Sequence, residues 1–386
     1  MRVGSNRTIL AVGLALLSVG AAGGQNRPEP KAALAENVFK NVQVLKGITV
    51  NEFMETMGVF SASTLLNCTD CHTKESAGNW ENYADDTPIK RTARRMVQMM
   101  QTINQSFFGG RRVITCYSCH RGDERPRPTP NLAELYATPP LQEPDQIVEQ
   151  APGMPSADSL LDKYIEVIGG AQKVAGITSF VAKGIYDGSP VSLMTGQSPI
   201  EIFAKAPDQR TMIIHTKAGD ATTVFDGQSA WSAAPSLYSP LPVVPLTGTD
   251  LDAAKVEAVL TFPARIKQSL ANWRVGFPFV IDNKDVQVVQ GISAARQPVK
   301  LYFDSKTGLL VRLVRYTTLP VGLNPIQTDY SDYREVSGIK VPFKMRLTWV
   351  DGQATVSLTD VQLNAPVNAA AFAKPNPPVS PKAATP

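Results

Sequence analysis

The stretch that organises this chain is Cys68-Thr69-Asp70-Cys71-His72, which returns as Cys116-Tyr117-Ser118-Cys119-His120. Both copies have the pattern C-x-x-C-H, which is typical of covalent attachment of a c-type haem. The two thiols bind the porphyrin, and the His that follows supplies an imidazole to the iron. All four Cys of the chain lie in these motifs. The sequence therefore predicts two covalent haem c groups, with these attachment and axial residues: Cys68, Cys71, Cys116, Cys119, His72 and His120.

Three other uses of the cysteines compete with this prediction. A C-x-x-C pair can be a redox-active disulfide, although that motif needs no His after it. The two pairs could share one zinc ion, but the 44 residues between Cys71 and Cys116 exceed the roughly 15–20 of compact four-Cys sites. Structural disulfides are the third alternative, since exported proteins often carry them.

The composition and the N-terminus indicate an exported protein of two or more domains. The chain has 386 residues, 43% of them hydrophobic, and its net charge of +4 gives no case for nucleic-acid binding. Residues 1–24 resemble a secretory signal, with Arg2 and Arg7 before a short apolar run at 9–19 and small residues at 20–24. No Cys lies near the expected cleavage site, so we expect no lipid anchor there. The predicted location is the periplasm or the exterior, in soluble form after cleavage.

The segment before and between the motifs predicts two helices. Asn51 is expected to cap a helix that begins near Glu52. Thr87-Pro88 predicts the start of a second helix, because an N-cap is followed by Pro at the first helical position, and Gly109-Gly110 would end it. The apolar residues at helical spacing are Phe53, Met54, Met57 and Phe60 in the first helix and Met96, Met99, Met100, Ile103 and Phe107 in the second.

Residues 38–128 resemble two haem segments of the cytochrome c subunit of bacterial photosynthetic reaction centres. The shared features are V-Q-V-L-K at 42–46, E-F-M-E-T-M at 52–57, R-R-M at 94–96 and the two motifs. In that family a Met on the helix before each motif is the sixth iron ligand, which implies Met57 and Met96 here. Family members carry four haems and are often lipid-anchored through an N-terminal Cys, whereas this chain has two motifs and lacks such a Cys.

Other candidates for the sixth ligand stay open. A Met stripe at helical spacing also fits core packing. Met54 is the second candidate for the first iron. His215 is the remaining imidazole of the chain, and it lies in a predicted strand at 212–215, where we expect an ordinary strand residue.

The two motifs lie in segments of opposite charge. Residues 49–87 carry seven acidic side chains and one basic one, whereas residues 88–127 carry nine basic and two acidic ones. Positive surroundings favour the reduced iron. The haem at Cys116 and Cys119 is therefore expected to have the higher reduction potential.

A second domain follows the dihaem domain, which we place at 25–122, and a Pro-rich linker at 123–157. We expect a short helix at 132–136 to dock on the dihaem domain. Residues 158–373 predict an α+β fold in which an antiparallel sheet curves around a helical plug at 250–273. This pattern is similar to the half-barrel fold of periplasmic lipoprotein carriers. Val259, Phe262, Ile266, Leu270 and Trp273 would form one face of the plug. We expect this domain to fold alone and the tail at 374–386 to be disordered.

These observations favour an electron carrier over a catalyst. It would transfer electrons between donor and acceptor proteins, with membrane redox complexes among the candidate partners and the second domain used for docking or ligand binding. One alternative is a peroxidase-like haem enzyme in which one iron lacks its Met. The other is a lipid- or lipoprotein-binding module with accessory haems, in which the plugged sheet leaves an apolar groove. No catalytic side chain is predicted.

Overall fold

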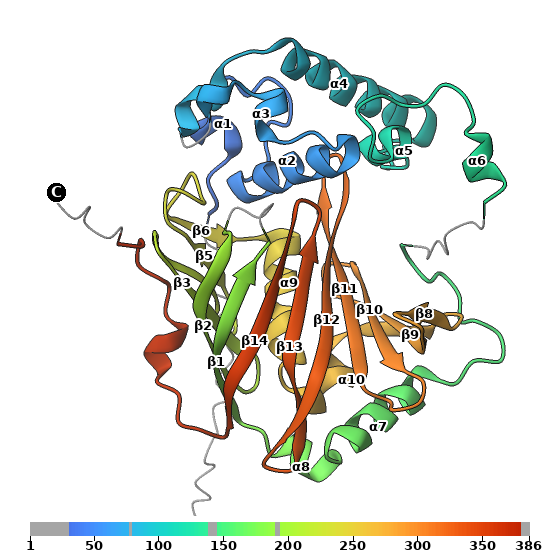
Figure 1. The fold of residues 1–386 in the computed structure, drawn as a ribbon, viewed down its shortest axis with the longest axis vertical. Coiled ribbons are helices and arrows are strands. Elements are labelled where there is room, and N and C mark those ends of the chain that lie inside the picture. The colour runs from blue at the N-terminus through green and yellow to red at the C-terminus, as the bar shows by residue number, and fades with distance from the viewer. Residues whose placement is uncertain (1–30, 77–78, 138–144, 190–193, 380–386) are drawn as a thin grey trace, which may run out of the picture.

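The computed structural model describes residues 31–76, 79–137, 145–189 and 194–379. A helical domain is followed by a domain built on one antiparallel sheet (Figure 1), which confirms the predicted fold class. The predicted signal segment at 1–24 and the end of the predicted tail at 380–386 lie outside the described residues. Within the described ranges, no helix combines the length and the apolar character that crossing a membrane requires.

The helical domain contains two long helices, each followed by a short helix that carries a motif. Its elements are α1 (Ala35–Val38), α2 (Val50–Thr64), α3 (Cys68–Cys71), η1 (Lys74–Ser76), η2 (Trp80–Ala84), α4 (Pro88–Phe108), α5 (Cys116–His120) and α6 (Leu132–Leu135).

The long helices begin and end where local chemistry dictates. The expected cap at Asn51 is wrong, because Thr49 caps α2 in a capping box with Glu52. Asn51 lies inside the first turn and bonds to other partners instead. Thr87 caps α4 with Pro next to it, as predicted, and α4 ends at Gly109, whose φ of 61° is left-handed.

Fourteen strands form one sheet in the described part of the second domain. They are β1 (Ser179–Gly188), β2 (Gly196–Lys205), β3 (Gln209–Thr216), β4 (Gly219–Phe225), β5 (Ala230–Ala233), β6 (Val243–Leu246), β7 (Ala271–Val275), β8 (Phe279–Ile281), β9 (Lys284–Ile292), β10 (Pro298–Asp304), β11 (Leu310–Leu319), β12 (Gly322–Val336), β13 (Ile339–Trp349) and β14 (Gly352–Leu363). Their order is β6-β5-β4-β3-β2-β1-β14-β13-β12-β11-β10-β9-β7, with β8 also on β9.

Helices pack behind the sheet and across its lower end in Figure 1. They are α7 (Ala157–Ile168), α8 (Ala171–Ala175), α9 (Gly248–Leu260), η3 (Pro263–Arg265) and α10 (Ile266–Ser269). Phe262, Ile266 and Leu270 are each at most 6% exposed in the main core. This packing favours a filled half-barrel over an apolar groove.

The predicted plug is wrong at its C-terminal end. Helical structure stops at Ser269, and Trp273 lies on β7, which pairs with β9. Its spacing of three from Leu270 matched a helix by coincidence, and pairing at the sheet edge decides the local structure.

The Pro-rich segment divides into an exposed part and a docked part. Helix α6 forms, but Leu132, Leu135 and Tyr136 are 62–84% exposed, so the expected docking is wrong. Ile147 instead packs on the sheet domain, where its backbone N–H and C=O bond to the Gln290 side chain at 2.7 and 3.1 Å. The segment after the last strand also packs on the sheet domain. Helix η4 (Ala369–Phe372) buries Phe372 against this domain, and Thr211 donates to the Ala371 carbonyl at 2.7 Å.

The two domains share a hydrophobic cluster, which we call the junction core. Its buried members are Leu45, Val59, Val97, Met100, Leu319 and Val321. Leu319 is the last residue of β11 and Val321 lies in the turn to β12, and these two residues are 0% and 1% exposed. The Arg112 guanidinium donates to the Leu319 carbonyl. The hairpin tip of the sheet domain therefore completes the core of the helical domain, with α2 lying across the strand ends (Figure 1).

Candidate haem-binding site

Each motif occupies a short capped helix. The Asn67 side chain accepts from the backbone N–H of Thr69 and Asp70 at 2.9 and 3.2 Å, so α3 begins at Cys68. Thr115 caps α5 in the same way by accepting from Ser118 N–H at 3.2 Å. Residues three apart on a helix lie on one face. Both thiols of each motif therefore point to the same side.

The cysteines are free thiols in the structure, and no disulfide joins them. Cys68 and Cys119 are exposed, whereas Cys71 and Cys116 are half-buried. Burial raises the pKa of Cys116 to about 11 and also raises the pKa of Cys71. Both thiols are therefore less acidic than an exposed cysteine. Among the residues that the structure describes, no group of three His, Cys, Asp or Glu is arranged to hold a metal ion.

The two motif histidines have the same orientation. Nδ1 of His72 lies 3.1 Å from the Tyr83 carbonyl oxygen, and Nδ1 of His120 lies 3.0 Å from that of Asp123. A carbonyl oxygen only accepts, so Nδ1 carries the proton and Nε2 keeps its lone pair. Burial, and then the charge of Lys90, lower the pKa of His72. Its neutral ring is thus the metal-binding form.

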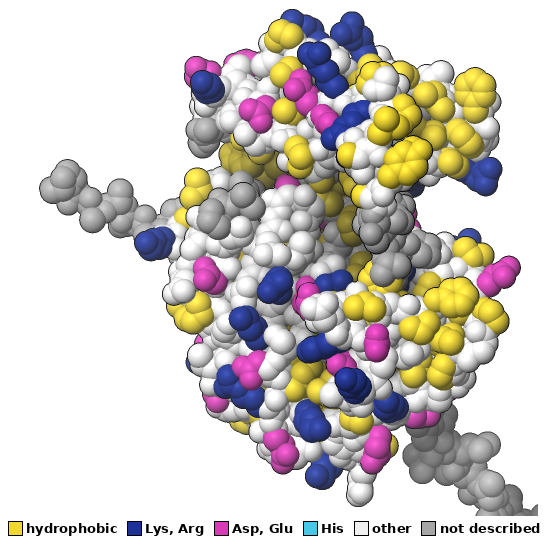
Figure 2. All heavy atoms as spheres, turned by 45° about the vertical axis from the view of Figure 1, so that its right-hand side comes forward, with side chains coloured by type: hydrophobic (Ala, Val, Ile, Leu, Met, Phe, Trp, Pro, Cys, Tyr) yellow, Lys and Arg dark blue, Asp and Glu magenta, His cyan; other side chains and the backbone are white. Residues whose placement is uncertain are grey.

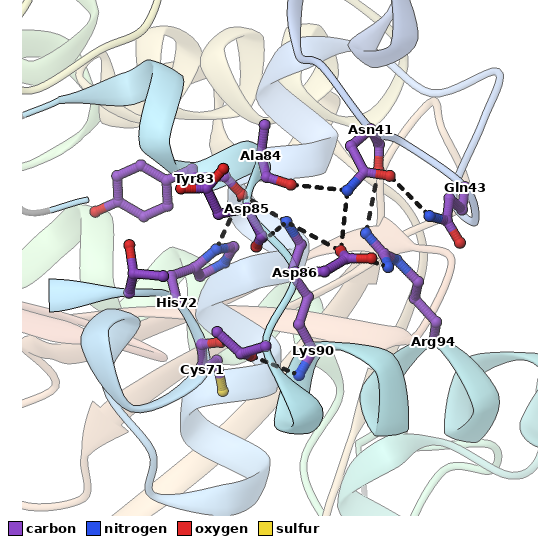
Figure 3. Close-up of polar contacts among 12 residues, drawn as sticks. Asn41, Gln43, Cys71, His72, Tyr83, Ala84, Asp85, Asp86, Lys90 and Arg94 are labelled. Atoms are coloured by element: carbon purple, nitrogen blue, oxygen red, sulfur yellow. Dashed lines mark hydrogen bonds and ion pairs between the residues drawn. The ribbon is translucent and has the colours of Figure 1, made fainter. Parts of the chain in front are cut away.

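A polar network supports the loop behind His72 (Figure 3). The Tyr83 carbonyl also accepts from Lys90 Nζ at 2.6 Å. Arg94 pairs with Asp86 at 2.8 Å, and Asn41 Nδ2 donates to Asp86 at 2.9 Å. These bonds join the N-terminal segment, the loop after the first motif and the first turns of α4.

This network contradicts the assumption behind the expected order of the two reduction potentials, which was that the basic segment 88–127 surrounds the second motif. Lys90 and Arg94 belong to the basic segment that the sequence associates with the second motif, yet they lie beside the first one. The reason is the length of α4, whose 21 residues extend roughly 30 Å. Its first turn follows directly from the loop of the first motif, so net charge per segment does not report the surroundings of each motif.

The candidate methionines occupy different environments. Met57 on α2 is half-buried and packs against the junction core, to which Cys116 also contributes. Met96 and Met99 on α4 are 37% and 46% exposed, whereas Met100 is buried in the junction core. Met54, the second candidate for the first iron, is half-buried on α2. Figure 2 shows that hydrophobic side chains gather on one face of the helical domain.

His215, the remaining candidate, lies on β3 of the sheet domain, where its Nδ1 bonds to the Asp220 carboxylate at 2.8 Å. This environment agrees with the expectation that His215 is an ordinary strand residue.

The helices of the two repeats pack crosswise. Helix α2 packs on α5, and α4 packs on α3. Each long helix therefore contacts the motif of the other repeat. With two thiols on one side of a helical turn and a His tautomer that keeps its Nε2 lone pair on the next residue, the donor set fits a covalently bound haem.

The part of the chain that carries the two motifs is similar to known proteins. Residues 18–141 match the family model described as photosynthetic reaction centre cytochrome C subunit. The reaction-centre cytochrome c subunit of Roseobacter denitrificans is 35% identical over 107 residues, which are 26% of this chain and 28% of that protein. The subunit of Thermochromatium tepidum is 36% identical over 97 residues, covering 24% and 23%. The predicted resemblance is confirmed for the N-terminal part, while the chain spans about a quarter of the length of these relatives.

Solved structures resemble more than half of the chain, whereas the reaction-centre subunits match about a quarter of it. A LolA superfamily protein from Nitrosomonas europaea covers 57% of this chain and 99% of its own, at 16% identity and a TM-score of 0.40. A DUF1329 family protein from Desulfovibrio piger covers 57% and 98%, at 9% identity and a TM-score of 0.39. This likeness is one of fold alone.

Sequence reasoning missed the residues that orient the histidines. Tyr83 and Asp123 act through backbone carbonyls, which carry no residue-type signal. The caps at Asn67 and Thr115 could have been found, because an Asn or Thr followed three residues later by a polar side chain is a helix-start signature.

Proposed function

We propose that the helical domain carries two covalent haem c groups and transfers electrons between redox partner proteins. Cys68 and Cys71 would hold the first haem, and Cys116 and Cys119 the second. His72 and His120 would be the axial ligands, with Met57 and Met96 as sixth ligands. The sheet domain would support the helical domain and provide a docking surface, in a protein located in the periplasm or exported.

The observation that carries this proposal is the repeated fixing of an imidazole tautomer. In both motifs a backbone carbonyl holds Nδ1–H at 3.0–3.1 Å, and a capped helical turn presents two thiols just before that His. Redox-active or structural cysteines would not need either His to be oriented in this way.

The bound haems would supply one-electron chemistry, and the protein would set their ligation. The His72 and His120 rings, whose Nδ1–H groups are held by backbone carbonyls, would offer Nε2 to a metal. A thioether Met opposite a His raises the reduction potential and leaves no open position for a substrate. This set of ligands favours electron transfer over peroxidase-like chemistry.

Mass spectrometry of the denatured full-length protein, expressed with a haem-attachment system, tests the proposal. We expect two haem masses on the chain and no free thiol. The double variant Cys68→Ala/Cys71→Ala should carry one haem, and so should Cys116→Ala/Cys119→Ala. A wild-type chain with no covalent haem, or with bound zinc, would contradict the proposal.

Carbon monoxide separates the carrier from the enzyme. The reduced wild-type protein should show no spectral change with carbon monoxide, because both irons would be six-coordinate. A carbon monoxide complex of the wild-type protein would favour a haem enzyme instead.

A further inference from the structure

We propose that Lys90 is a positioning residue that raises the reduction potential of the first haem by sharing the Tyr83 carbonyl with His72. This inference rests on the proposed function, since it requires a haem at Cys68 and Cys71. It concerns how the chain distinguishes two motifs that look equivalent in sequence.

The geometry around the Tyr83 carbonyl is well defined. Its oxygen accepts from Lys90 Nζ at 2.6 Å and lies 3.1 Å from His72 Nδ1 (Figure 3). A carbonyl has two lone pairs and can serve both donors. The Tyr83 ring also packs against the His72 ring, with centroids 4.8 Å apart. The carbonyl and the imidazole are therefore held together by two contacts.

Lys90 is itself fixed in place. Its backbone N–H donates to Thr87 Oγ1 at 3.1 Å, and the Thr87 hydroxyl donates to the Cys71 carbonyl at 2.5 Å. The Lys90 side chain is 15% exposed and also donates to the Asp85 carbonyl at 3.1 Å. The Lys90 backbone is thus tied to the turn that carries the motif, and its ammonium is tied to the loop that follows the motif.

The nearby carboxylate does not cancel this charge. Asp86 lies 4.0 Å from Lys90 Nζ but only 2.8 Å from Arg94, so its first partner is the guanidinium. The motif also contains the acidic Asp70, but the charged groups that act on the His72 ring itself are Lys90 and Arg94. The charge that this ring experiences is therefore positive.

Two effects of Lys90 act in the same direction. An ammonium bound to the carbonyl oxygen draws electron density from it, so the oxygen accepts the His72 N–H less strongly. A weaker bond to Nδ1–H makes the imidazole a poorer electron donor to a metal. The positive charge also directly disfavours the more positive, oxidised iron. Both effects stabilise the reduced state.

The second motif has a different partner. The carbonyl that accepts from His120 belongs to Asp123, whose own carboxylate pairs with Arg127 at 3.3 Å. At the first motif the carbonyl is bound by a half-buried lysine, whereas at the second it belongs to an acidic residue. The two imidazoles should therefore differ in basicity although both motifs read C-x-x-C-H.

The test is a spectroelectrochemical titration of full-length Lys90→Met, which removes the ammonium and keeps an unbranched side chain. Arg91→Met is the matched control, because it removes a neighbouring, exposed positive charge from the same turn of α4. NMR signals of the His72 and His120 rings assign each transition to its haem. We expect Lys90→Met to shift the first-haem equilibrium about tenfold towards the oxidised form, which is about 59 mV for one electron.

The controls define what would overturn the inference. Arg91→Met should move neither transition by more than a small fraction of that shift. Lys90→Arg should give the first haem the reduction potential of the wild-type protein. The His72 Nδ1 proton signal should move in Lys90→Met, while His120 stays unchanged. An unaltered first potential in Lys90→Met, or an equal shift in Arg91→Met, would overturn the role of Lys90.

Failure of the inference and failure of the proposed function look different. If mass spectrometry finds no haem at the first motif of the wild-type protein, the proposed function fails. If haem is present and the potential does not respond to Lys90, only the inference fails. If Lys90→Met does not fold, Lys90→Gln and Lys90→Arg decide the matter, because the charge hypothesis predicts that they give different potentials.

Discussion

The Oε2 atom of Glu55 lies 3.1 Å from Nδ2 of Asn324, across the junction between the helical domain and the sheet. Thr317 also donates to this oxygen at 3.1 Å, and Asn51 donates to Oε1 at 3.2 Å. Burial raises the pKa of Glu55. A carboxyl group on α2 is thus the acceptor that ties β11 and β12 to the helix two residues before Met57.

Removing this acceptor should loosen the junction. Glu55→Ala leaves the buried Asn324 amide and the Thr317 hydroxyl without this partner, and we expect a loss of about 1–3 kcal/mol in the free energy of unfolding. Glu55→Gln keeps an amide oxygen for both donors and should cost less. Urea unfolding of the full-length protein measures both variants, and an equal loss in the two would contradict this role of the acceptor.

The neighbouring Asp250 should make stability depend on pH. Burial, and then the charge of Glu55, raise the pKa of Asp250 to about 7. In the unfolded chain an Asp titrates near 3.9, so the folded state binds more protons between these values. Stability from this group is full below about pH 4 and is lost as pH rises towards 7.

The melting temperature between pH 5 and pH 8 checks this expectation. Asp250→Asn should be more stable than the wild-type protein at pH 8 and should have a flatter pH profile. The exposed Asp187→Asn retains Asp250 and should keep the wild-type slope. A slope that persists unchanged in Asp250→Asn would assign the pH dependence to other groups.

The hairpin tip should support the helical domain more than the sheet. Leu319→Ala removes a fully buried side chain from the junction core, and we expect a loss of about 2–5 kcal/mol. Leu323 on the same hairpin is 39% exposed, so Leu323→Ala should change stability far less. Hydrogen exchange should show faster opening of α2 and α4 in Leu319→Ala, with the sheet little affected. Equal opening of both domains would mean that they unfold as one unit.

The proposed sixth ligands predict a spectroscopic change. Met57→Ala and Met96→Ala should each leave one iron five-coordinate and able to bind carbon monoxide. Met99→Ala is the matched control on α4, because Met99 is similarly exposed but is not a proposed ligand. If Met54→Ala gives the change and Met57→Ala does not, the first iron takes its ligand one turn earlier.

The docked end of the linker should contribute measurably to the sheet domain. Gln290→Leu removes the side chain that bonds to the Ile147 backbone and should cost about 1–3 kcal/mol. Gln287 on the same strand has a buried Oε1 without a hydrogen-bond partner, so Gln287→Leu should be neutral or stabilising. The changes in melting temperature that the two substitutions cause should therefore differ in sign or size. A Gln290→Leu protein as stable as the wild type would mean that the linker is not held there.

Local sequence signals predicted individual helices and strands better than they predicted which of these elements pack together. Thr87-Pro88 and Gly109 mark both ends of α4 because capping chemistry is encoded within a few residues. Asp226-Gly227 lies between β4 and β5, and Asp351-Gly352 lies where β13 turns into β14, as the preference of Asp-Gly for tight turns favours. The short strands β6 and β8 have only four and three residues, which carry too little periodicity to be recognised in a sequence.

The sequence predicted the residues that would bind haem covalently, but it did not predict the residues that orient and support them. The C-x-x-C-H motifs are contiguous, so their residue types and spacing are visible in the sequence. The Tyr83 carbonyl and Lys90 become neighbours of His72 only after the loop folds back. The junction core was also invisible, because Leu319 and Val59 are far apart in sequence and each looks like an ordinary core residue of its own domain.

The late position of the hairpin tip has a consequence for biogenesis. When the chain emerges from its N-terminus at export, both motifs arrive before Leu319 and Val321. Until those residues arrive, the junction core lacks two of its buried members, and the Cys116 side chain beside it is less enclosed. We expect this interval to be the time when an attachment enzyme has the freest access to the second motif. Completion of the sheet would then close the helices around the matured site.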